Sequence, residues 1–93
     1  MGKESNIEAK ACKYAKDLDF YVRKFSSPSQ RGVPDRLFLS PHGVVFFIEF
    51  KAPGKEPTAL QLREIELIRS NNGNAYWADS LDGAKKIIDK YAI

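Results

Sequence analysis

The sequence has one cysteine and one histidine among its 93 residues. Cys12 therefore cannot form a disulfide within the chain, and its helical surroundings favour a packing role. These two residues cannot supply the ligands of a typical zinc site. No apolar run reaches the roughly 18 residues of a membrane span, and the N-terminus lacks the apolar core of a secretory signal. We therefore expect no disulfide, no zinc and no membrane association.

The balance of charge is only weakly one-sided. The sequence contains fifteen Lys and Arg residues and twelve Asp and Glu residues, which gives a formal net charge of +3. That excess is compatible with a polyanionic partner, but an ordinary mixed surface would carry the same charge. The length predicts a single domain over residues 1–93. A chain this short buries a modest fraction of its surface, so a partner subunit would help to stabilise it.

Periodicity and turn residues divide the chain into alternating helices and strands. Ser5–Glu8 and Thr58–Gln61 both have the form of a helix capping box. Clusters of Pro, Gly and Ser separate the regular segments. The predicted elements are a helix over 5–18, strands over 20–25, 35–40 and 44–51, a helix from 58 to about 73, a strand over 75–78 and a helix capped by Ser80.

This order predicts an α/β fold with a mixed sheet flanked by helices. The short Pro41–Gly43 turn makes the strands over 35–40 and 44–51 antiparallel. The helix that follows allows a parallel return strand over 75–78. The strand over 44–51 is apolar on both faces, so we expect it inside the sheet.

Three charged residues gather at one end of the predicted hairpin. Glu49 and Lys51 point to the same face of their strand, because alternate side chains share a face. Asp35 precedes the turn residue His42 by seven positions and Glu49 follows it by seven, so the two carboxylates should lie opposite each other. Their repulsion is offset if they share a cation. Carboxylate oxygens suit Mg²⁺ or Mn²⁺.

The sequence combines three features: the run Gly-Val-Pro-Asp up to Asp35, the Glu49-Phe50-Lys51 triplet and the helical Gln61. Together they resemble the motifs of the VRR-NUC family of the PD-(D/E)XK nuclease superfamily. The resemblance implies a restriction-endonuclease-like αβββαβ core and metal-dependent cleavage of DNA to a 3′-hydroxyl and a 5′-phosphate. It implies metal ligands at Asp35, Glu49 and the Phe50 backbone carbonyl. Catalytic roles would fall to Asp35, Glu49, Lys51 and Gln61, with Lys51 orienting water and stabilising negative charge.

Several of these residues also have a purely structural interpretation. A Glu-x-Lys triplet is common on exposed strands. Glu8 either caps the first helix or faces the metal, and Gln61 either completes a cap or positions the site. Arg31, Lys55 and Arg63 either contact phosphates or are ordinary surface charges.

Tyr76 and Trp77 fit core or interface packing better than stacking on bases, and His42 fits an exposed turn. The expected function is a DNA endonuclease acting on branched DNA such as Holliday junctions, assembled as a homodimer. The alternatives are a flap or nicking nuclease and a non-catalytic nucleic-acid-binding module. We expect a cytoplasmic location, at the nucleoid or, for a viral protein, in the host cell.

Overall fold

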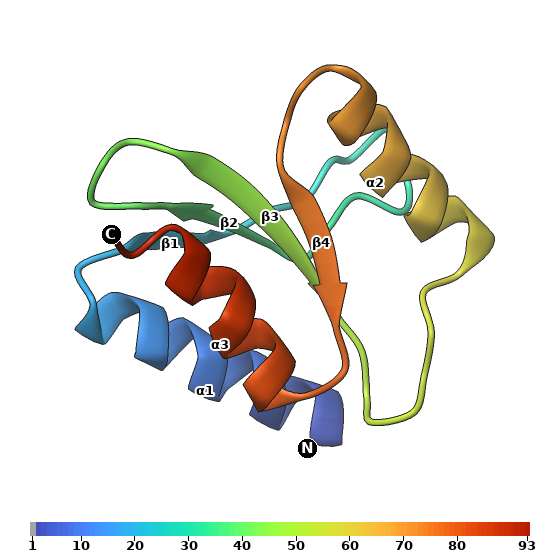
Figure 1. Cartoon of the computed structure of the whole chain (residues 1–93). Helices are drawn as coiled ribbons and strands as arrows, with labels where there is room; N and C mark the ends of the chain where they lie inside the picture. Colours follow the sequence, from blue (N-terminus) through green and yellow to red (C-terminus); the bar gives the residue numbers. More distant parts are fainter. Residues whose placement is uncertain (1) are drawn as a thin grey trace.

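The computed structural model describes residues 2–93 (Figure 1). Its elements follow the predicted order. They are α1 (Lys3–Asp17), β1 (Tyr21–Lys24), β2 (Arg36–Leu39), β3 (Val45–Phe50), α2 (Ala59–Ser70), β4 (Ala75–Ala78) and α3 (Leu81–Lys90). None of the helices within residues 2–93 is long and apolar enough to cross a bilayer.

The four strands form one mixed sheet in the order β1-β2-β3-β4. β1 pairs with β2 and β2 with β3 in antiparallel fashion, while β3 pairs with β4 in parallel. The predicted hairpin, the predicted crossover and the internal place of β3 are therefore confirmed. The sheet brings the C-terminal end of β3 beside the N-terminal end of β2.

One face of the sheet holds the main hydrophobic core. In Figure 1, α1 and α3 lie side by side against this face, whereas α2 stands apart beside β4. The alternate β3 residues Phe46, Ile48 and Phe50 are fully buried there. Alanines at the helix contacts let α1 and α3 approach the sheet closely. The buried helix residues of this core are Ala11, Cys12, Ala15, Ala84 and Ile88.

The opposite face, under α2, is covered more thinly. Ile65 of α2 and Ala75 of β4 are buried there. Phe47 packs on Phe25, with 4.9 Å between ring centroids. One helix cannot cover the whole face, and Leu60, Leu62 and Leu67 on α2 remain exposed. Along β3, the residues that alternate with the core run from exposed at Val45 through half-buried at Phe47 to buried at Glu49.

The start of α1 differs from the prediction. The helix begins at Lys3 with Gly2 as its N-cap and no side-chain cap, so the capping box over Ser5–Glu8 was wrong. Ser5 lies inside the helix, where its hydroxyl donates to the Gly2 carbonyl at 2.8 Å. The added turn releases Glu8 from a capping role.

The caps of α2 and α3 are as predicted, although α2 ends sooner. Thr58 and Gln61 form a complete capping box, and the Ser80 side chain accepts from the Gly83 N–H. α2 stops at Ser70, and the Gly73 N–H then bonds to the Ile68 carbonyl at 2.9 Å. A Cβ at Gly73 would lie 2.7 Å from the Ile68 side chain, so only glycine fits this turn.

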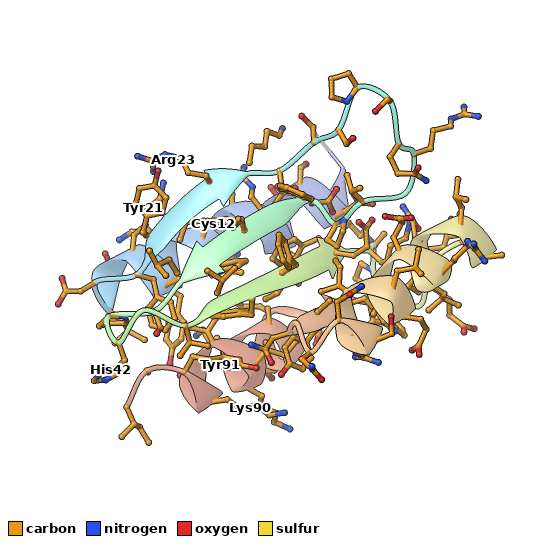
Figure 2. The ribbon with its side chains drawn as sticks, turned by 90° about the horizontal axis from the view of Figure 1, so that it is seen from above. Cys12, Tyr21, Arg23, His42, Lys90 and Tyr91 are labelled. Atoms are coloured by element: carbon orange, nitrogen blue, oxygen red, sulfur yellow. The ribbon has the colours of Figure 1, made fainter. Side chains whose placement is uncertain are left out.

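The outer edge of β1 is covered by one of its own side chains. The Phe25 N–H donates to the Asp35 carbonyl, so the alternate Val22 carbonyl points away from β2. The Arg23 Nη1 donates to that carbonyl at 2.8 Å, and its guanidinium lies 4.1 Å from the centre of the Tyr21 ring. Figure 2 shows Tyr21 and Arg23 together at this edge. A charged group on an edge strand opposes pairing with another strand.

Candidate active site

The hairpin brings Asp35 and Glu49 together. Arg36 pairs with Ile48 in the β2–β3 ladder, so Asp35 and Glu49 come next in register. The Phe50 N–H donates to Asp35 Oδ2 at 2.8 Å. Asp35 therefore lies against the strand that carries Glu49, on the face covered by α2. The sequence count around His42 predicted this juxtaposition.

Glu49 is a buried carboxylate with one oxygen left unpaired. The residue is only 3% exposed. Oε2 accepts from the Gln61 amide at 2.9 Å, but Oε1 is buried and has no hydrogen-bond partner within residues 2–93. Burial, and after it the neighbouring Asp35, raises the pKa of Glu49 to about 8 against the opposing effect of Lys51. An unpaired buried carboxylate oxygen calls for a ligand, because buried polar groups are otherwise nearly always bonded.

Asp35 has a similar electrostatic environment. Burial raises its pKa, the hydrogen bond from the Phe50 N–H lowers it, and the nearby Glu8 and Glu4 raise it again. Glu4 also raises the pKa of Glu49. The sequence interpretation missed Glu4, although it precedes Glu8 by one helical turn and so shares its side of α1. The excess of negative charge at this end of the sheet favours a bound cation.

Gln61 connects the site to the start of α2. Its Oε1 accepts from the Thr58 N–H at 2.8 Å and from Lys51 Nζ at 3.3 Å. Its Nε2 donates to Glu49. The cap and the contacts with the candidate site were alternatives in the sequence, but one side chain makes both.

Glu8 does not cap α1, and its role at a metal site stays a prediction. It forms a largely buried ion pair with Arg36, with 2.5 Å between Oε2 and Nε. Arg36 follows Asp35, so its side chain points to the other face of the sheet, toward α1. Nothing local in the sequence indicated this pairing, since 28 positions separate the two residues.

The carbonyl of Phe50 lacks a partner from the neighbouring strand. In the β2–β3 ladder, the Ser40 N–H donates to the Val44 carbonyl. Hydrogen-bonded pairs alternate along an antiparallel ladder, so every second pair counted from Ser40 and Val44 is of the hydrogen-bonded kind. Extending the register beyond Arg36 and Ile48 sets Phe50 opposite Pro34. Proline has no N–H to donate. The proline before Asp35 therefore leaves the Phe50 carbonyl available to another ligand.

Comparison with known proteins gives a consistent result. No family model matches the chain. The putative nuclease p44 of Acyrthosiphon pisum secondary endosymbiont phage 1 is 45% identical over 62 residues, which cover 67% of each protein. A solved structure of a VRR_NUC domain superposes with a TM-score of 0.89 at 33% identity, covering 98% of this chain and 99% of that one. The chain belongs to the VRR-NUC family.

Membership in the VRR-NUC family confirms the resemblance seen in the sequence and the predicted αβββαβ architecture. It also supports a nuclease-type function. A VRR-NUC fold suggests a divalent metal, and the donors present fit one. Asp35, Glu49 and the Phe50 carbonyl offer oxygen atoms, which Mg²⁺ and Mn²⁺ prefer. No group of three or more His, Cys, Asp or Glu side chains suited to a metal occurs within residues 2–93, so the backbone carbonyl would matter.

The remaining predicted site residues lie at the margins of this cluster or away from it. Arg31 and Lys55 are exposed in the two loops at this end of the sheet, and Arg63 is exposed on α2. None of these three forms an ion pair in the described part of the chain. His42 is exposed at the opposite end of the molecule from α2 (Figure 2).

Two glycines shape the loops that carry the basic residues. Gly32 has a φ of +87°, and a Cβ there would lie 3.0 Å from the Leu60 carbonyl oxygen. The absence of a side chain at Gly32 therefore lets the loop of Arg31 lie close to the start of α2. Gly54 has a φ of +80°, and its N–H donates to Asp79 at 3.1 Å, which fixes the turn before Lys55.

The two aromatic residues of β4 face opposite sides. Tyr76 packs against the main core, and its hydroxyl bonds to that of Tyr91, the C-cap of α3. Trp77 is the β4 neighbour of Glu49 and is half-buried. The Tyr76 hydroxyl is therefore already bonded within the chain, and Trp77 lies next to Glu49.

Proposed function

We propose that this protein is a Mg²⁺- or Mn²⁺-dependent endodeoxyribonuclease. One arrangement of side chains carries the proposal. Asp35 and Glu49 lie side by side, Glu49 has a buried oxygen without a partner within residues 2–93, and Lys51 is linked to Glu49 through Gln61. A site for hydrolysing phosphodiesters needs this combination of a negative cradle and a nearby ammonium group.

Each residue has a separate task in the proposed reaction. Asp35, Glu49 and the Phe50 carbonyl would hold the metal, which when bound polarises the phosphate and makes its water more acidic. Lys51 orients the attacking water and stabilises the negative charge that develops on the phosphate. Gln61 restrains Lys51 and Glu49 relative to each other. Water adds to phosphorus and the bond to the 3′ oxygen breaks, which leaves a 3′-hydroxyl and a 5′-phosphate.

The proposed substrate is branched DNA, such as a Holliday junction. Arg31, Lys55 and Arg63 are exposed on two loops and a helix, where they would contact backbone phosphates. One site cuts one strand, so paired cuts across a symmetric junction require two chains related by a two-fold axis. We therefore propose a homodimer. The exposed leucines of α2 are available to it, whereas Arg23 obstructs pairing through β1.

A cleavage assay tests this function. The protein is incubated with end-labelled four-way junctions, flaps, nicked duplexes and linear duplexes, each with Mg²⁺, Mn²⁺ or EDTA. We expect paired nicks in the junction, only with metal, and none with the matched Asp35→Asn variant. Tight binding without cleavage under every condition would instead favour a non-catalytic nucleic-acid-binding module. Cleavage restricted to flaps would retain the nuclease and reject the junction.

A further inference from the structure

The Gln61 side-chain amide has three polar neighbours, two of which can only donate. The Thr58 N–H lies 2.8 Å from Oε1, and Lys51 Nζ lies 3.3 Å from it. A backbone N–H and an ammonium group have no acceptor. The atom that faces them must be the carbonyl oxygen, so the amide NH₂ is directed at Glu49, 2.9 Å away.

Of the two donors, Thr58 is the better placed to fix this orientation. Its N–H belongs to a backbone that is itself held, since the Thr58 carbonyl accepts from Leu62 at 2.9 Å and its hydroxyl accepts from the Gln61 N–H at 3.2 Å. Lys51 makes the longer contact, from the end of a flexible stem whose three protons rotate freely. Lys51 can therefore follow the amide but cannot hold it.

We propose that Thr58 is a positioning residue of the active site, acting through its backbone N–H on the Gln61 amide; this inference rests on the proposed function. Without that N–H, Oε1 keeps only its longer contact with the flexible Lys51, so the amide can swing away from Glu49. Lys51 and Glu49 would then lose the side chain that holds them in a fixed relation.

The side-chain cap and the N–H can be separated by substitution. Thr58→Ala removes the hydroxyl and keeps the N–H, whereas Thr58→Pro removes both. The φ of −68° at Thr58 already suits proline. Thr58→Ser keeps both groups and is the conservative control. Alanine and proline therefore form a matched pair that differs at the N–H.

We expect kcat for junction cleavage to be about tenfold lower in Thr58→Pro than in Thr58→Ala, because one hydrogen bond is worth roughly that factor. KM should change much less, since no residue that contacts DNA is altered. Thr58→Ser should restore the wild-type kcat. Melting temperatures measured beside the kinetics separate the loss of the cap, which both variants share, from the loss of the N–H. Equal kcat values for the alanine and proline variants would overturn the proposal.

A second measurement does not depend on cleavage or on the folding of Thr58→Pro. Amide hydrogen exchange is followed by NMR. The Thr58 N–H should exchange slowly in the wild-type protein and faster in Gln61→Met. Equal exchange at Thr58 in both proteins would also overturn the proposal. If the wild-type protein cuts no DNA, the proposed function fails, yet this experiment still decides whether Thr58 holds the amide.

Discussion

Asp35 is bound to the strand that carries its partner carboxylate: its Oδ2 accepts the backbone N–H of Phe50 at 2.8 Å. Phe50 is the residue between Glu49 and Lys51. The same short piece of backbone therefore positions the side chains of Asp35, Glu49 and Lys51. The orientation of Asp35 therefore does not depend on a metal. Such preorganisation lowers the cost of assembling a site when the ligand arrives.

Asp35→Asn and Glu49→Gln should each abolish cleavage. Each change removes the charge of a proposed metal ligand with little change in volume, and an asparagine side chain at position 35 can still accept the Phe50 N–H. Folding should therefore be retained, as checked by circular dichroism and thermal melting. A variant that binds Mn²⁺ normally and cleaves at near the wild-type rate would remove that residue from the site.

The metal-free protein should lose stability as the pH rises. Burial raises the pKa of Glu49 from 4.5 to about 8, so its folded state prefers the protonated form. That contribution is complete below about pH 4.5 and is lost as the pH rises through about 8, to an upper bound of about 5 kcal/mol. Asp35 acts in the same direction.

Urea unfolding in EDTA at pH 5, 7 and 9 measures this loss. Glu49→Gln is the matched control and should flatten the dependence of the free energy of unfolding on pH. At pH 9 this variant should therefore be more stable than the wild-type protein. Identical, flat profiles for the two proteins would contradict the assigned environment of Glu49.

Lys51→Ala should lower kcat about 10²-fold, the usual effect of losing one donor to developing negative charge. Metal affinity should remain, since Lys51 is not a ligand. Lys55→Ala is the control, and we expect it to raise KM and reduce the salt dependence of binding instead. Lys51 would be a phosphate clamp if its loss lowered DNA affinity and left turnover intact.

Pro34→Ala should weaken metal binding. The substitution introduces a backbone N–H that can donate to the Phe50 carbonyl, which Pro34 leaves free, and a hydrogen-bonded carbonyl is a poorer ligand. We expect about tenfold lower Mn²⁺ affinity by calorimetry, the worth of about one hydrogen bond. The new N–H at position 34 should also be protected from exchange. Pro28→Ala, in the exposed part of the same loop, controls for added chain flexibility, and equal affinities would reject this role for Pro34.

Sedimentation equilibrium at micromolar concentration should find a dimer. Leu60 and Leu67 are seven residues apart on α2 and lie on the same side of it, so Leu67→Asp should dissociate a dimer formed there. Val44→Asp, at the far end of the sheet, replaces a similarly exposed residue and should have no effect. A strict monomer that cuts both opposing strands together would exclude the dimer.

Local signals predicted most of this molecule. The Thr58 cap, the turn at His42 and the alternation along β3 are short-range features, and they placed Asp35 opposite Glu49 correctly. The predicted start of α1 was wrong. Ser5 matches a capping pattern, but the helix already begins at Lys3. The Glu8–Arg36 pair was out of reach, since it depends on how α1 lies across the sheet.

Trp77, the β4 neighbour of Glu49, is the only tryptophan in the chain. The intrinsic fluorescence of the protein excited at the red edge therefore comes from one indole ring next to Glu49. Any ion or strand of DNA that reaches Glu49 changes the polarity around that ring. The protein thus carries its own optical probe, and occupancy of the site can be followed in real time without an attached dye.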